Sequence, residues 1–544
     1  MNRIEILSTL EKKPPAVLIV GAGINGAGTF RDLALNGVDV VLVDRGDFCS
    51  GASAASSHMA HGGIRYLENG EFRLVREAVR ERNRMLQNAP HLVKPLATTI
   101  PIFKVFSGLL NAPLKFLGWL DKPSERGALV IKLGLLLYDA YTGGQKTVPR
   151  HSFFGRKEAL GRFPQLNPAI RYAARYYDGS IFSPERYTVE LILDAEGEGS
   201  HARALNYVSL VGRDAGKVVL KDEISGQSYK ICPQLIVNAA GPWIDHANRG
   251  LALTTEYIGG TKGSHLVIDN PDLRQAIGKT EFFFENQDGR IVLIFPLADK
   301  VMIGTTDLPI SDPDSALCTE DEVDYFIEMV ARVFPDIPVT RAQIVFRFSG
   351  VRPLAKTQAK NAGQITRDHH IMQDLLGAIP VYSLVGGKWT SYRAFAEQVT
   401  DRVLADLGRA RKAETACLPI GGGRGYATAR QTVSPRDEGL FARYGTRSVE
   451  INTYIAAGED APLEHMPDLT RGEIAFLVEA EKVVHLDDLL LRRTMLAFLG
   501  HLTRPLVDEV AGICAAILRW DESQRAAEVT RVLDLLAARH AVRL

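Results

Sequence analysis

The alternation of apolar and polar positions is clearest near the start of the chain, where two short apolar runs flank a glycine-rich turn and a helical stretch. The segment 17–44 reads VLIVGAGINGAGTFRDLALNGVDVVLVD. Its first apolar run ends at Gly21 and its second ends at Asp44. A strand, a glycine turn, a helix and a second strand in this order are typical of a Rossmann-type unit. The pattern therefore predicts an α/β protein that opens with such a unit.

Two later regions differ from this opening in their periodicity. Residues 259–306 contain short alternating apolar runs, which predict a mixed or antiparallel sheet. After the glycine-rich CLPIGGGRG, which has the composition of a linker, only helical periodicities follow, at 472–484, 486–499, 505–520 and 522–542. We therefore expect residues 1–415 to form a discontinuous two-domain core with a mixed-sheet substrate domain, and residues 420–544 to form an α-helical C-terminal domain.

The pattern assigns the remaining elements less sharply. It predicts helices at 65–88 and 187–205, a strand at 171–177, and strand pairs at 208–220 and 235–238. The polar start MNRIEILSTLEKKPP lacks the features of a signal peptide, and we expect it to be a short arm before the first strand.

Composition excludes several classes of protein. A chain of 544 residues is too long to fold around one hydrophobic core, so two or three domains are expected. Lys plus Arg and Asp plus Glu are 64 each, which gives no reason to expect a nucleic-acid partner. The five cysteines show no CxxC or other metal-binding spacing, so we predict no metal site and a reducing, cytoplasmic location.

One apolar region suggests contact with a membrane surface. Residues 102–120 (IFKVFSGLLNAPLKFLGWL) and 128–138 (ALVIKLGLLLY) are interrupted by Lys104, Lys115 and Lys132. No uninterrupted run reaches the roughly 18 residues of a spanning helix. The region either packs on its own protein, or it lies in a membrane interface with aromatic and leucine side chains in lipid and lysines at headgroups. The second interpretation predicts a peripheral protein on the inner face of the membrane.

The glycine turn carries the first chemical signal. Gly21 permits the tight turn, Gly23 lets a pyrophosphate approach the backbone, and Gly26 allows helix and strand to pack closely. The helix N-terminus offers N–H groups to the phosphates. Asp44 lies at the expected spacing of about 20 residues, where a carboxylate accepts hydrogen bonds from a ribose. These residues predict an adenine dinucleotide, either FAD or NAD.

Two further stretches favour FAD over NAD. Residues 50–67, SGASAASSHMAHGGIRYL, form a thin path of small residues with many hydroxyl and amide donors, which suits a diphosphate and a flavin ring. Residues 235–243, LIVNAAGPW, are an apolar strand of the kind that returns to the cofactor in many flavoproteins. The predicted cofactor contacts in these stretches are Ser53, Ser56, Ser57, Gly62, Gly63, Asn238 and Gly241.

The chain resembles the FAD-dependent, aerobic-type glycerol-3-phosphate dehydrogenase/oxidase family. The resemblance is carried by GAGINGAG, SAASSHMAHGGIRYLE, NAAGPW, SGVRPL and GGKWTSYR, with support from IKLGLLLYD and IGTTD, between about residues 17 and 400. It implies a glutathione-reductase-like, D-amino-acid-oxidase-like FAD-binding domain. It also implies that Gly387 and Thr390 of the last large motif contact the cofactor.

The resemblance further implies oxidation of sn-glycerol 3-phosphate to dihydroxyacetone phosphate, with electrons passed to a quinone. Arg352 and Arg367 match positions that grip the phosphate, Arg65 adds a cation near the flavin, and Lys388 matches a lysine beside flavin and substrate. A base must also remove the hydroxyl proton. His61 is the first candidate, because a neutral imidazole suits a pH near 7, and His265 is the second.

Some positions depart from the family pattern and keep alternatives open. The chain reads SPERY at 183–187 where the family often carries Asp-Ala-Arg, so Arg186 is shifted in register. Trp389 replaces a smaller apolar residue, and 111–126 has no clear counterpart. A flavin enzyme for a 2-hydroxy acid or amino acid, a soluble oxidase that uses oxygen, and a non-catalytic flavin-binding membrane scaffold or redox sensor therefore stay open. The sequence does not determine the oligomeric state.

Overall fold

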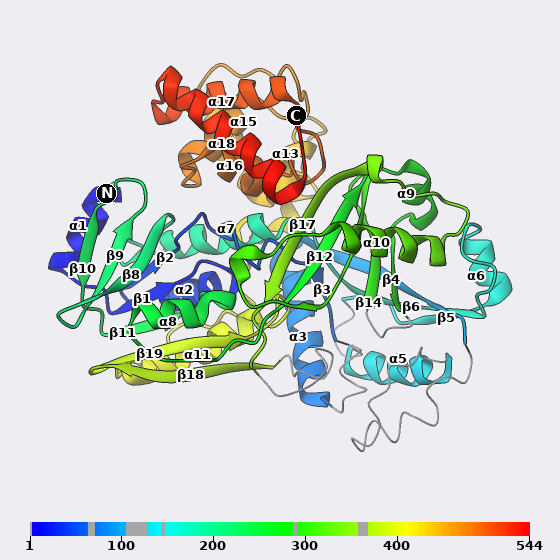
Figure 1. The fold of residues 1–544 in the computed structure, drawn as a ribbon, viewed down its shortest axis with the longest axis horizontal. Coiled ribbons are helices and arrows are strands. Elements are labelled where there is room, and N and C mark those ends of the chain that lie inside the picture. The colour runs from blue at the N-terminus through cyan, green and yellow to red at the C-terminus, as the bar shows by residue number, and fades with distance from the viewer. Residues whose placement is uncertain (1–2, 64–70, 105–127, 143–146, 287–290, 357–367) are drawn as a thin grey trace.

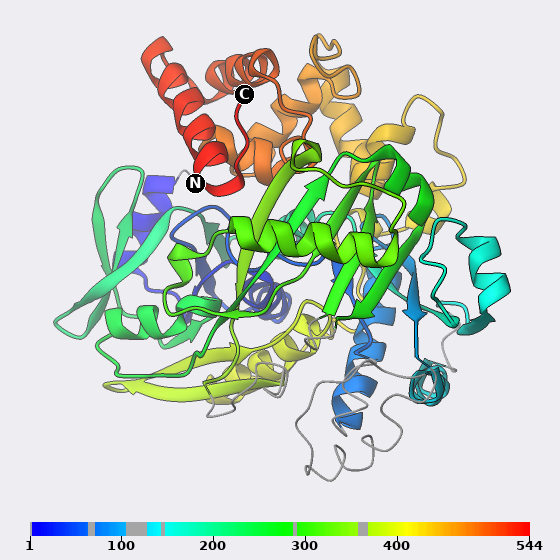
Figure 2. The same ribbon diagram turned by 45° about the vertical axis from the view of Figure 1, so that its right-hand side comes forward.

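The computed structural model describes residues 3–63, 71–104, 128–142, 147–286, 291–356 and 368–544. Two large sheets lie side by side, and a group of helices from the end of the chain sits above them (Figure 1). A view turned by 45° shows the same helical group over the junction of the two sheets (Figure 2). This arrangement confirms the predicted α/β fold with a helical C-terminal domain. The domain boundary between 415 and 420 stays a prediction.

The first sheet contains the Rossmann-type unit and has the strand order β18-β19-β11-β1-β2-β7. Its strands run parallel except β18, which pairs antiparallel with β19 at one edge. Both faces are covered, so β1 and β2 are apolar at every position. The strands are β1 (Val17–Val20), β2 (Val40–Val43), β7 (Ala202–Leu205), β11 (Leu235–Asn238), β18 (His369–Leu376) and β19 (Ile379–Gly386).

Helices cover one face of this sheet and a small antiparallel sheet covers the other. The helices are α2 (Ile24–Leu35), α7 (Pro184–Glu196) and α11 (Tyr392–Asp406), and α8 (Ile244–Gly250) follows β11. The small sheet has the order β10-β9-β8 and packs with the first helix of the chain. These elements are α1 (Arg3–Lys12), β8 (Val208–Asp214), β9 (Lys217–Asp222) and β10 (Ser228–Ile231).

The second large sheet has ten strands and is mixed, as the alternating runs predicted. The order is β16-β12-β15-β14-β13-β4-β6-β3, with β17 beside β12 and β5 beside β6. Most neighbours are antiparallel, but β13 and β4 are parallel. The strands are β3 (Met59–Ala60), β4 (Val93–Ile102), β5 (Ser152–Gly155), β6 (Tyr172–Ile181), β12 (Thr261–Ile268), β13 (Thr280–Glu285), β14 (Ile291–Leu297), β15 (Lys300–Gly304), β16 (Leu308–Pro309) and β17 (Ile344–Arg352).

Helices also pack on both faces of this sheet. Helices α6 (Arg156–Arg162), α9 (Pro271–Ile277) and α10 (Glu320–Val333) share one core with it, and the C-terminal helices share another. The C-terminal helices are α12 (Tyr426–Ala429), α13 (Glu438–Tyr444), α14 (Ser448–Ala456), α15 (Arg471–Ala480), α16 (Leu486–Asp488), the π-helical turn Leu489–Arg493, α17 (Arg504–Leu518) and α18 (Glu522–His540).

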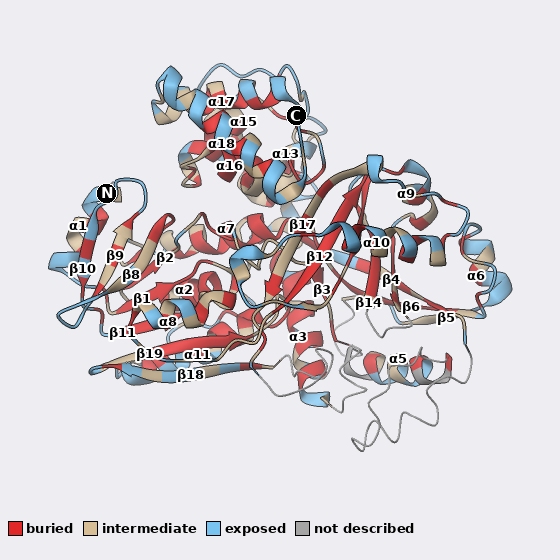
Figure 3. Cartoon of the chain, in the orientation of Figure 1, coloured by how far each residue is buried: buried red, intermediate tan, exposed pale blue. Residues whose placement is uncertain are grey.

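Buried ion pairs join the C-terminal helices to the rest of the chain. The two Asp47 carboxylate oxygens accept hydrogen bonds from Arg493 Nη1 and Nη2 at 2.7 and 2.9 Å. Arg186 pairs with Glu481 of the C-terminal domain and lies over the Tyr444 ring. Removing one partner of such a buried pair leaves the other charge buried and unpaired, which lowers the free energy of unfolding by about 3–5 kcal/mol. Figure 3 shows buried positions concentrated in the two sheets and the helices against them.

Two helices, α3 (Phe72–Asn88) and α5 (Ala128–Thr142), cover the part of the second sheet farthest from the C-terminal helices (Figure 1). The inner side of α5 is buried, but Leu133, Leu136 and Leu137 are 62%, 51% and 38% exposed. Over the described parts of the chain, the structure holds no helix with the length and hydropathy required to span a membrane. Most of the apolar region 102–120 lies outside the described residues.

Three predicted elements differ in the structure. The N-terminal segment, expected as a short arm, is helix α1, because Ile6, Leu7 and Leu10 bury one face against the small sheet. The helix predicted at 187–205 ends at Glu196. Gly199 then adopts φ +133°, and Ala202–Leu205 joins the first sheet beside β2. The helix predicted at 486–499 continues only to Arg493.

Candidate active site

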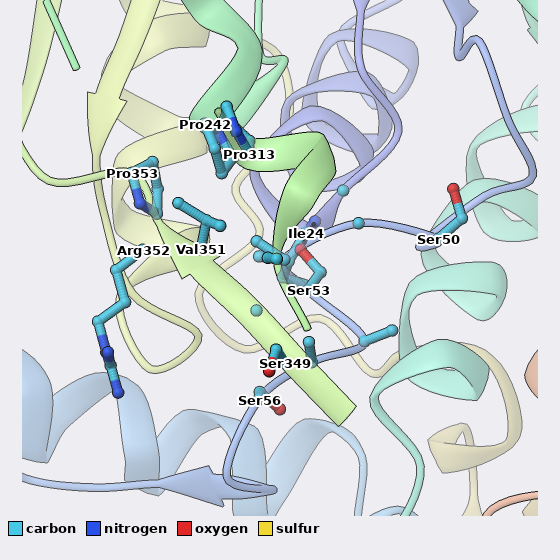
Figure 4. Close-up of a pocket in the computed structure, with 18 of the residues that line it drawn as sticks. Ile24, Ser50, Ser53, Ser56, Pro242, Pro313, Ser349, Val351, Arg352 and Pro353 are labelled. Atoms are coloured by element: carbon cyan, nitrogen blue, oxygen red, sulfur yellow. Dashed lines mark hydrogen bonds between the residues drawn. The ribbon is translucent and has the colours of Figure 1, made fainter. Parts of the chain in front are cut away.

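A cavity of 1550 Å³ lies between the two large sheets and continues under the C-terminal helices. Loops after β1, β2 and β11, the 50–63 loop, and strands β12 and β17 form its walls. In Figure 4, Ser53 and Ser56 of the loop lie across from Ser349 and Val351 of β17, and Pro242 and Pro313 lie near one end. The volume exceeds the roughly 300–1,000 Å³ of common small-molecule sites. It suits a ligand as long as a dinucleotide together with a substrate.

The three glycines after β1 are required for different physical reasons. Gly21 has φ +103°, and a Cβ there would lie 2.6 Å from the Ala239 carbonyl oxygen of the neighbouring strand end. At Gly26 a Cβ would lie 1.9 Å from the Gly21 carbonyl oxygen, so only glycine lets α2 start this close to β1. Gly21 and Gly23 border the cavity, and Gly26 does not. Gly26 therefore serves the packing of α2 on β1, and the roles of Gly21 and Gly23 toward a phosphate stay predictions.

Asp44 lies at the end of β2 on the cavity wall. Its carboxylate accepts the Ala22 N–H at 2.6 Å and the Gly46 N–H at 3.0 Å. Burial raises its pKa to about 6, and these two backbone hydrogen bonds oppose that rise. At pH 7 to 8 the group is therefore mainly ionised and can accept further hydrogen bonds.

The serine-rich loop passes the N-terminus of helix α2. Ser53 Oγ accepts the Ile24 N–H at 2.9 Å, and its carbonyl oxygen accepts the Trp389 Nε1–H at 2.9 Å. Ser53, Ser56 and Ser57 all border the cavity, as the predicted cofactor path requires. Trp389, the departure from the family pattern, therefore anchors the same loop.

The structure corrects the role expected of Asn238. Its amide nitrogen donates to Ile244 O at 2.9 Å and to Asn248 Oδ1 at 2.7 Å, and its Oδ1 accepts the Ala240 N–H at 3.2 Å. The side chain does not border the cavity. Asn238 instead shapes the turn that brings Ala239, Ala240 and Gly241 to the cavity wall.

Arg352 ends strand β17 with its guanidinium beside the cavity (Figure 4). Nη1 donates to Asp307 Oδ1 at 3.1 Å, and Nη2 donates to Thr305 Oγ1 and Thr306 O at 3.0 Å each. These partners come from the IGTTD motif, whose role the sequence did not reveal. They hold the guanidinium in one orientation, as a phosphate-binding arginine requires.

The GGKWTSYR motif meets the His61 loop at the cavity. Gly387 and Lys388 border the cavity together with His61 and Gly63. Thr390 and Gly62, both expected at the cofactor, lie behind this wall, where the Thr390 hydroxyl donates to the His61 carbonyl at 3.2 Å. Burial lowers the pKa of His369 behind the motif, and the Lys388 ammonium lowers it further.

His265 borders the same cavity from strand β12. Its Nε2 lies 2.8 Å from Ser57 Oγ, and its ring stacks on Phe348 at 4.8 Å between centroids. Burial lowers its pKa to about 3, and the nearby Arg352 charge adds to this. His265 is therefore neutral at physiological pH. Its Nδ1 is buried and has no hydrogen-bond partner among the described residues.

Some predicted residues cannot be placed, and others were missed. Arg65 and Arg367 lie outside the described residues. Arg186 of SPERY is directed to Glu481 and away from the cavity. The sequence did not indicate that the C-terminal domain forms part of the wall. Its cavity residues are Asp487, Leu491, Arg492, Phe498, Arg531, Leu535, Arg539 and His540. No local pattern links them to residues more than 400 positions earlier.

These residues would hold FAD. One end offers Asp44, Gly21 and the N-terminus of α2, which suit a ribose and a pyrophosphate. A Cβ at Gly23 would lie 3.0 Å from Ser53 Oγ, so glycine keeps the backbone clear at this point of the cavity wall. The other end offers Lys388, His61 and His265, which suit a flavin ring and a reacting substrate.

Replacing Asp44 with alanine is expected to weaken FAD retention by about 1–3 kcal/mol, because buried acceptors for the ribose are lost. FAD release measured by the recovery of flavin fluorescence should be faster. Asp39, at the opposite end of β2 and paired with Arg203, gives the matched control Asp39→Ala. Equal release from wild type and Asp44→Ala would remove Asp44 from the cofactor site.

Comparisons with known proteins agree with this geometry. Residues 16–402 match the family model for FAD dependent oxidoreductases, and residues 383–525 match that for the C-terminal domain of alpha-glycerophosphate oxidase. A glycerol-3-phosphate dehydrogenase from Synechocystis is 34% identical over 93% of this chain and 94% of its own. A D-erythritol 1-phosphate dehydrogenase from Brucella abortus is 30% identical over 88% and 93%.

The fold likewise matches a solved structure. The glycerol-3-phosphate dehydrogenase from Bacillus halodurans, complexed with FAD, superposes with a TM-score of 0.76 at 23% identity and covers 98% of this chain and 97% of its own. The family model matched by residues 16–402 resolves the choice between FAD and NAD in favour of FAD. By its family models, its nearly full-length relatives and the dinucleotide cavity between its sheets, the chain belongs to the FAD-dependent glycerol-3-phosphate dehydrogenase family.

Proposed function

We propose that this enzyme oxidises sn-glycerol 3-phosphate to dihydroxyacetone phosphate and passes the electrons to a quinone. The observation that carries the proposal is the convergence of Arg352 and Lys388 with two histidines on one cavity. A phosphomonoester dianion needs cations held in fixed geometry, and hydrogen bonds to Asp307, Thr305 and Thr306 hold Arg352. A 2-hydroxy acid would need fewer cations.

The residues of the cavity have the following proposed roles in this reaction. Arg352 binds the phosphate, and Lys388 stabilises negative charge beside the reacting carbon. His61 accepts the hydroxyl proton. His265 is less suitable as the base, because its Nε2 is hydrogen-bonded to Ser57 and its Nδ1 is buried in the protein. FAD supplies, when bound, the hydride acceptor for the substrate's second carbon. Arg65 and Arg367 are proposed as further phosphate ligands.

Anaerobic titration of the purified yellow protein tests this function. Glycerol 3-phosphate should bleach the flavin absorbance and yield stoichiometric dihydroxyacetone phosphate, whereas glycerol should bleach it only slowly and at high concentration, and lactate should not bleach it. D-Erythritol 1-phosphate is the critical comparison, because a relative carries that activity in its name. Stronger bleaching by that compound would reassign the substrate, whereas no bleaching by any of them would favour a non-catalytic flavoprotein. Reoxidation by a short-chain quinone compared with oxygen then identifies the acceptor.

A quinone is insoluble in water, so we propose that the enzyme works at the inner surface of the membrane. The outer face of α5 supports this, because Leu133, Leu136 and Leu137 are exposed beside the exposed Lys132. Leucines can enter the membrane interface while a lysine contacts anionic headgroups. The lysine adds about 1 kcal/mol to the free energy of membrane binding, and salt weakens this contribution. The aromatic residues 103–119 expected to contribute lie mostly outside the described residues.

Replacing Leu133, Leu136 and Leu137 together with serine should reduce co-sedimentation with anionic liposomes by at least half. Leu375, which is 59% exposed on the edge strand β18, provides the control Leu375→Ser, for which binding should not change. If the triple variant sediments as fully as wild type, α5 is not the anchor. If neither sediments at low salt, a soluble oxidase becomes the better description.

A further inference from the structure

One peptide unit in the cavity wall is held at both of its polar groups. The carbonyl oxygen of His61 accepts a hydrogen bond from Thr390 Oγ1 at 3.2 Å. The N–H of Gly62, at the other side of the same peptide bond, donates to Asp178 Oδ1 at 2.8 Å. A peptide is planar, so these two contacts fix the plane and thereby the backbone on which the His61 side chain is mounted.

A buried network lies behind Asp178. The Tyr138 hydroxyl donates to Asp178 Oδ1 at 2.6 Å and accepts from Arg82 Nη1 at 2.7 Å. Arg82 also donates to the Tyr177 carbonyl at 2.7 Å and to Asn83 Oδ1 at 2.8 Å. Arg82, Tyr138 and Asp178 are all buried. Burial raises the pKa of Tyr138 well above its ordinary value, so its hydroxyl stays protonated and donates.

The three side chains come from three different elements. Arg82 lies on α3, Tyr138 on α5 and Asp178 on β6, and both helices pack against that strand. The Tyr138 hydroxyl also limits the loop sterically, because a Cβ at Gly62 would lie 2.1 Å from it. Tyr138 therefore controls the loop in two ways, by contact at Gly62 and by its hydrogen bond to the Asp178 oxygen that receives the Gly62 N–H.

We infer that Tyr138 is a positioning residue, which acts through Asp178 to hold the His61–Gly62 peptide and so sets the place of the His61 imidazole. The inference rests on the proposed role of His61 as the base. A misplacement of about 1 Å at a reacting group can reduce the rate by about 10². Tyr138 touches the backbone of the His61 loop and not the cavity itself, so its loss affects the rate more than the binding of substrate or FAD.

Tyr138→Phe removes the hydroxyl and keeps the ring. Tyr382→Phe is the matched control, because the buried Tyr382 hydroxyl likewise donates to a carboxylate, Asp406, and accepts from an arginine, Arg402, but lies away from the cavity. In the FAD-loaded proteins, hydrogen exchange of the amides of residues 59–63 should become about tenfold faster in Tyr138→Phe and stay unchanged in Tyr382→Phe. Thr390→Val, which releases the other side of the same peptide, should reproduce the faster exchange.

The kinetic readout separates positioning from general destabilisation. In Tyr138→Phe, kcat for glycerol 3-phosphate should fall about tenfold, while KM and FAD content stay within about twofold of wild type. Unchanged exchange, faster exchange with unchanged kcat, or an equal fall of kcat in Tyr382→Phe would each overturn the inference. If Tyr138→Phe does not fold, Thr390→Val decides by the same two measurements. If glycerol 3-phosphate does not reduce the wild-type enzyme, the proposed function fails, and the exchange data alone then decide whether Tyr138 holds the loop.

Discussion

Replacement of His61 by asparagine is expected to lower kcat for glycerol 3-phosphate oxidation by about 10²–10⁴-fold, because a positioned general base contributes about that factor. FAD content and KM should change little, since the backbone at this position stays held by Thr390 and Asp178. Stopped-flow reduction of the flavin under anaerobic conditions measures the step directly, without any electron acceptor.

Two further histidine variants serve as comparisons for His61→Asn. His201 is half-buried, its Nε2 donates to the Ala34 carbonyl oxygen, and it lies away from the cavity, so His201→Asn should retain full activity. His265→Asn should reduce the rate less than His61→Asn, because the His265 Nε2 is already engaged by Ser57. The reverse order of effects would transfer the role of base to His265, acting through Ser57.

Replacement of Arg352 by glutamine is expected to raise KM for glycerol 3-phosphate about 10- to 100-fold, with FAD still bound. The loss of one charge-assisted contact to phosphate costs about 1.5–3 kcal/mol, which corresponds to that range. Glutamine keeps a polar side chain near Asp307 and Thr305, so the wall is disturbed less than by alanine. Steady-state kinetics with an artificial acceptor gives the value.

A comparison of glycerol with glycerol 3-phosphate shows whether Arg352 binds the phosphate group. Oxidation of glycerol, which lacks the phosphate, should be almost unaffected by Arg352→Gln. Arg347 lies on the same strand but pairs with Glu320 outside the cavity, so Arg347→Gln should behave as wild type. An equal loss for glycerol and glycerol 3-phosphate would show that Arg352 supports the cavity wall and does not bind the phosphate.

The Rossmann-type unit was predictable because its signals are local. The apolar runs that became β1 and β2, the glycines between them and Asp44 all lie within 28 residues, and each has a steric or hydrogen-bonding reason that acts at short range. Gly26 shows this most clearly, because only the absence of a Cβ lets α2 begin against the Gly21 carbonyl. The helical character of the C-terminal region was equally visible in its 3.6-residue periodicity.

Predictions that depended on side-chain direction were less secure. Asn238 belongs to a motif that does reach the cavity, but its side chain turns inward to Asn248 and Ile244. The motif indicated the right loop, and the fold decided which atoms of that loop face the ligand. The helix expected at 187–205 was wrong at its end for a related reason, since the free edge of β2 was available to pair with residues 202–205.

The sequence by itself thus determined the cofactor class, the order of the elements and the residues Arg352, Lys388, His61 and His265 as candidates for the chemistry. Only the tertiary structure brought these four residues to one cavity, and only it placed Arg492, Phe498 and His540 of the C-terminal helices in the same wall. It also revealed Tyr138 behind His61. The physical reason is separation along the chain: periodicity and turn chemistry act over a few residues, whereas contacts between residues 61 and 390 or 47 and 493 exist only after the sheets and helices have packed.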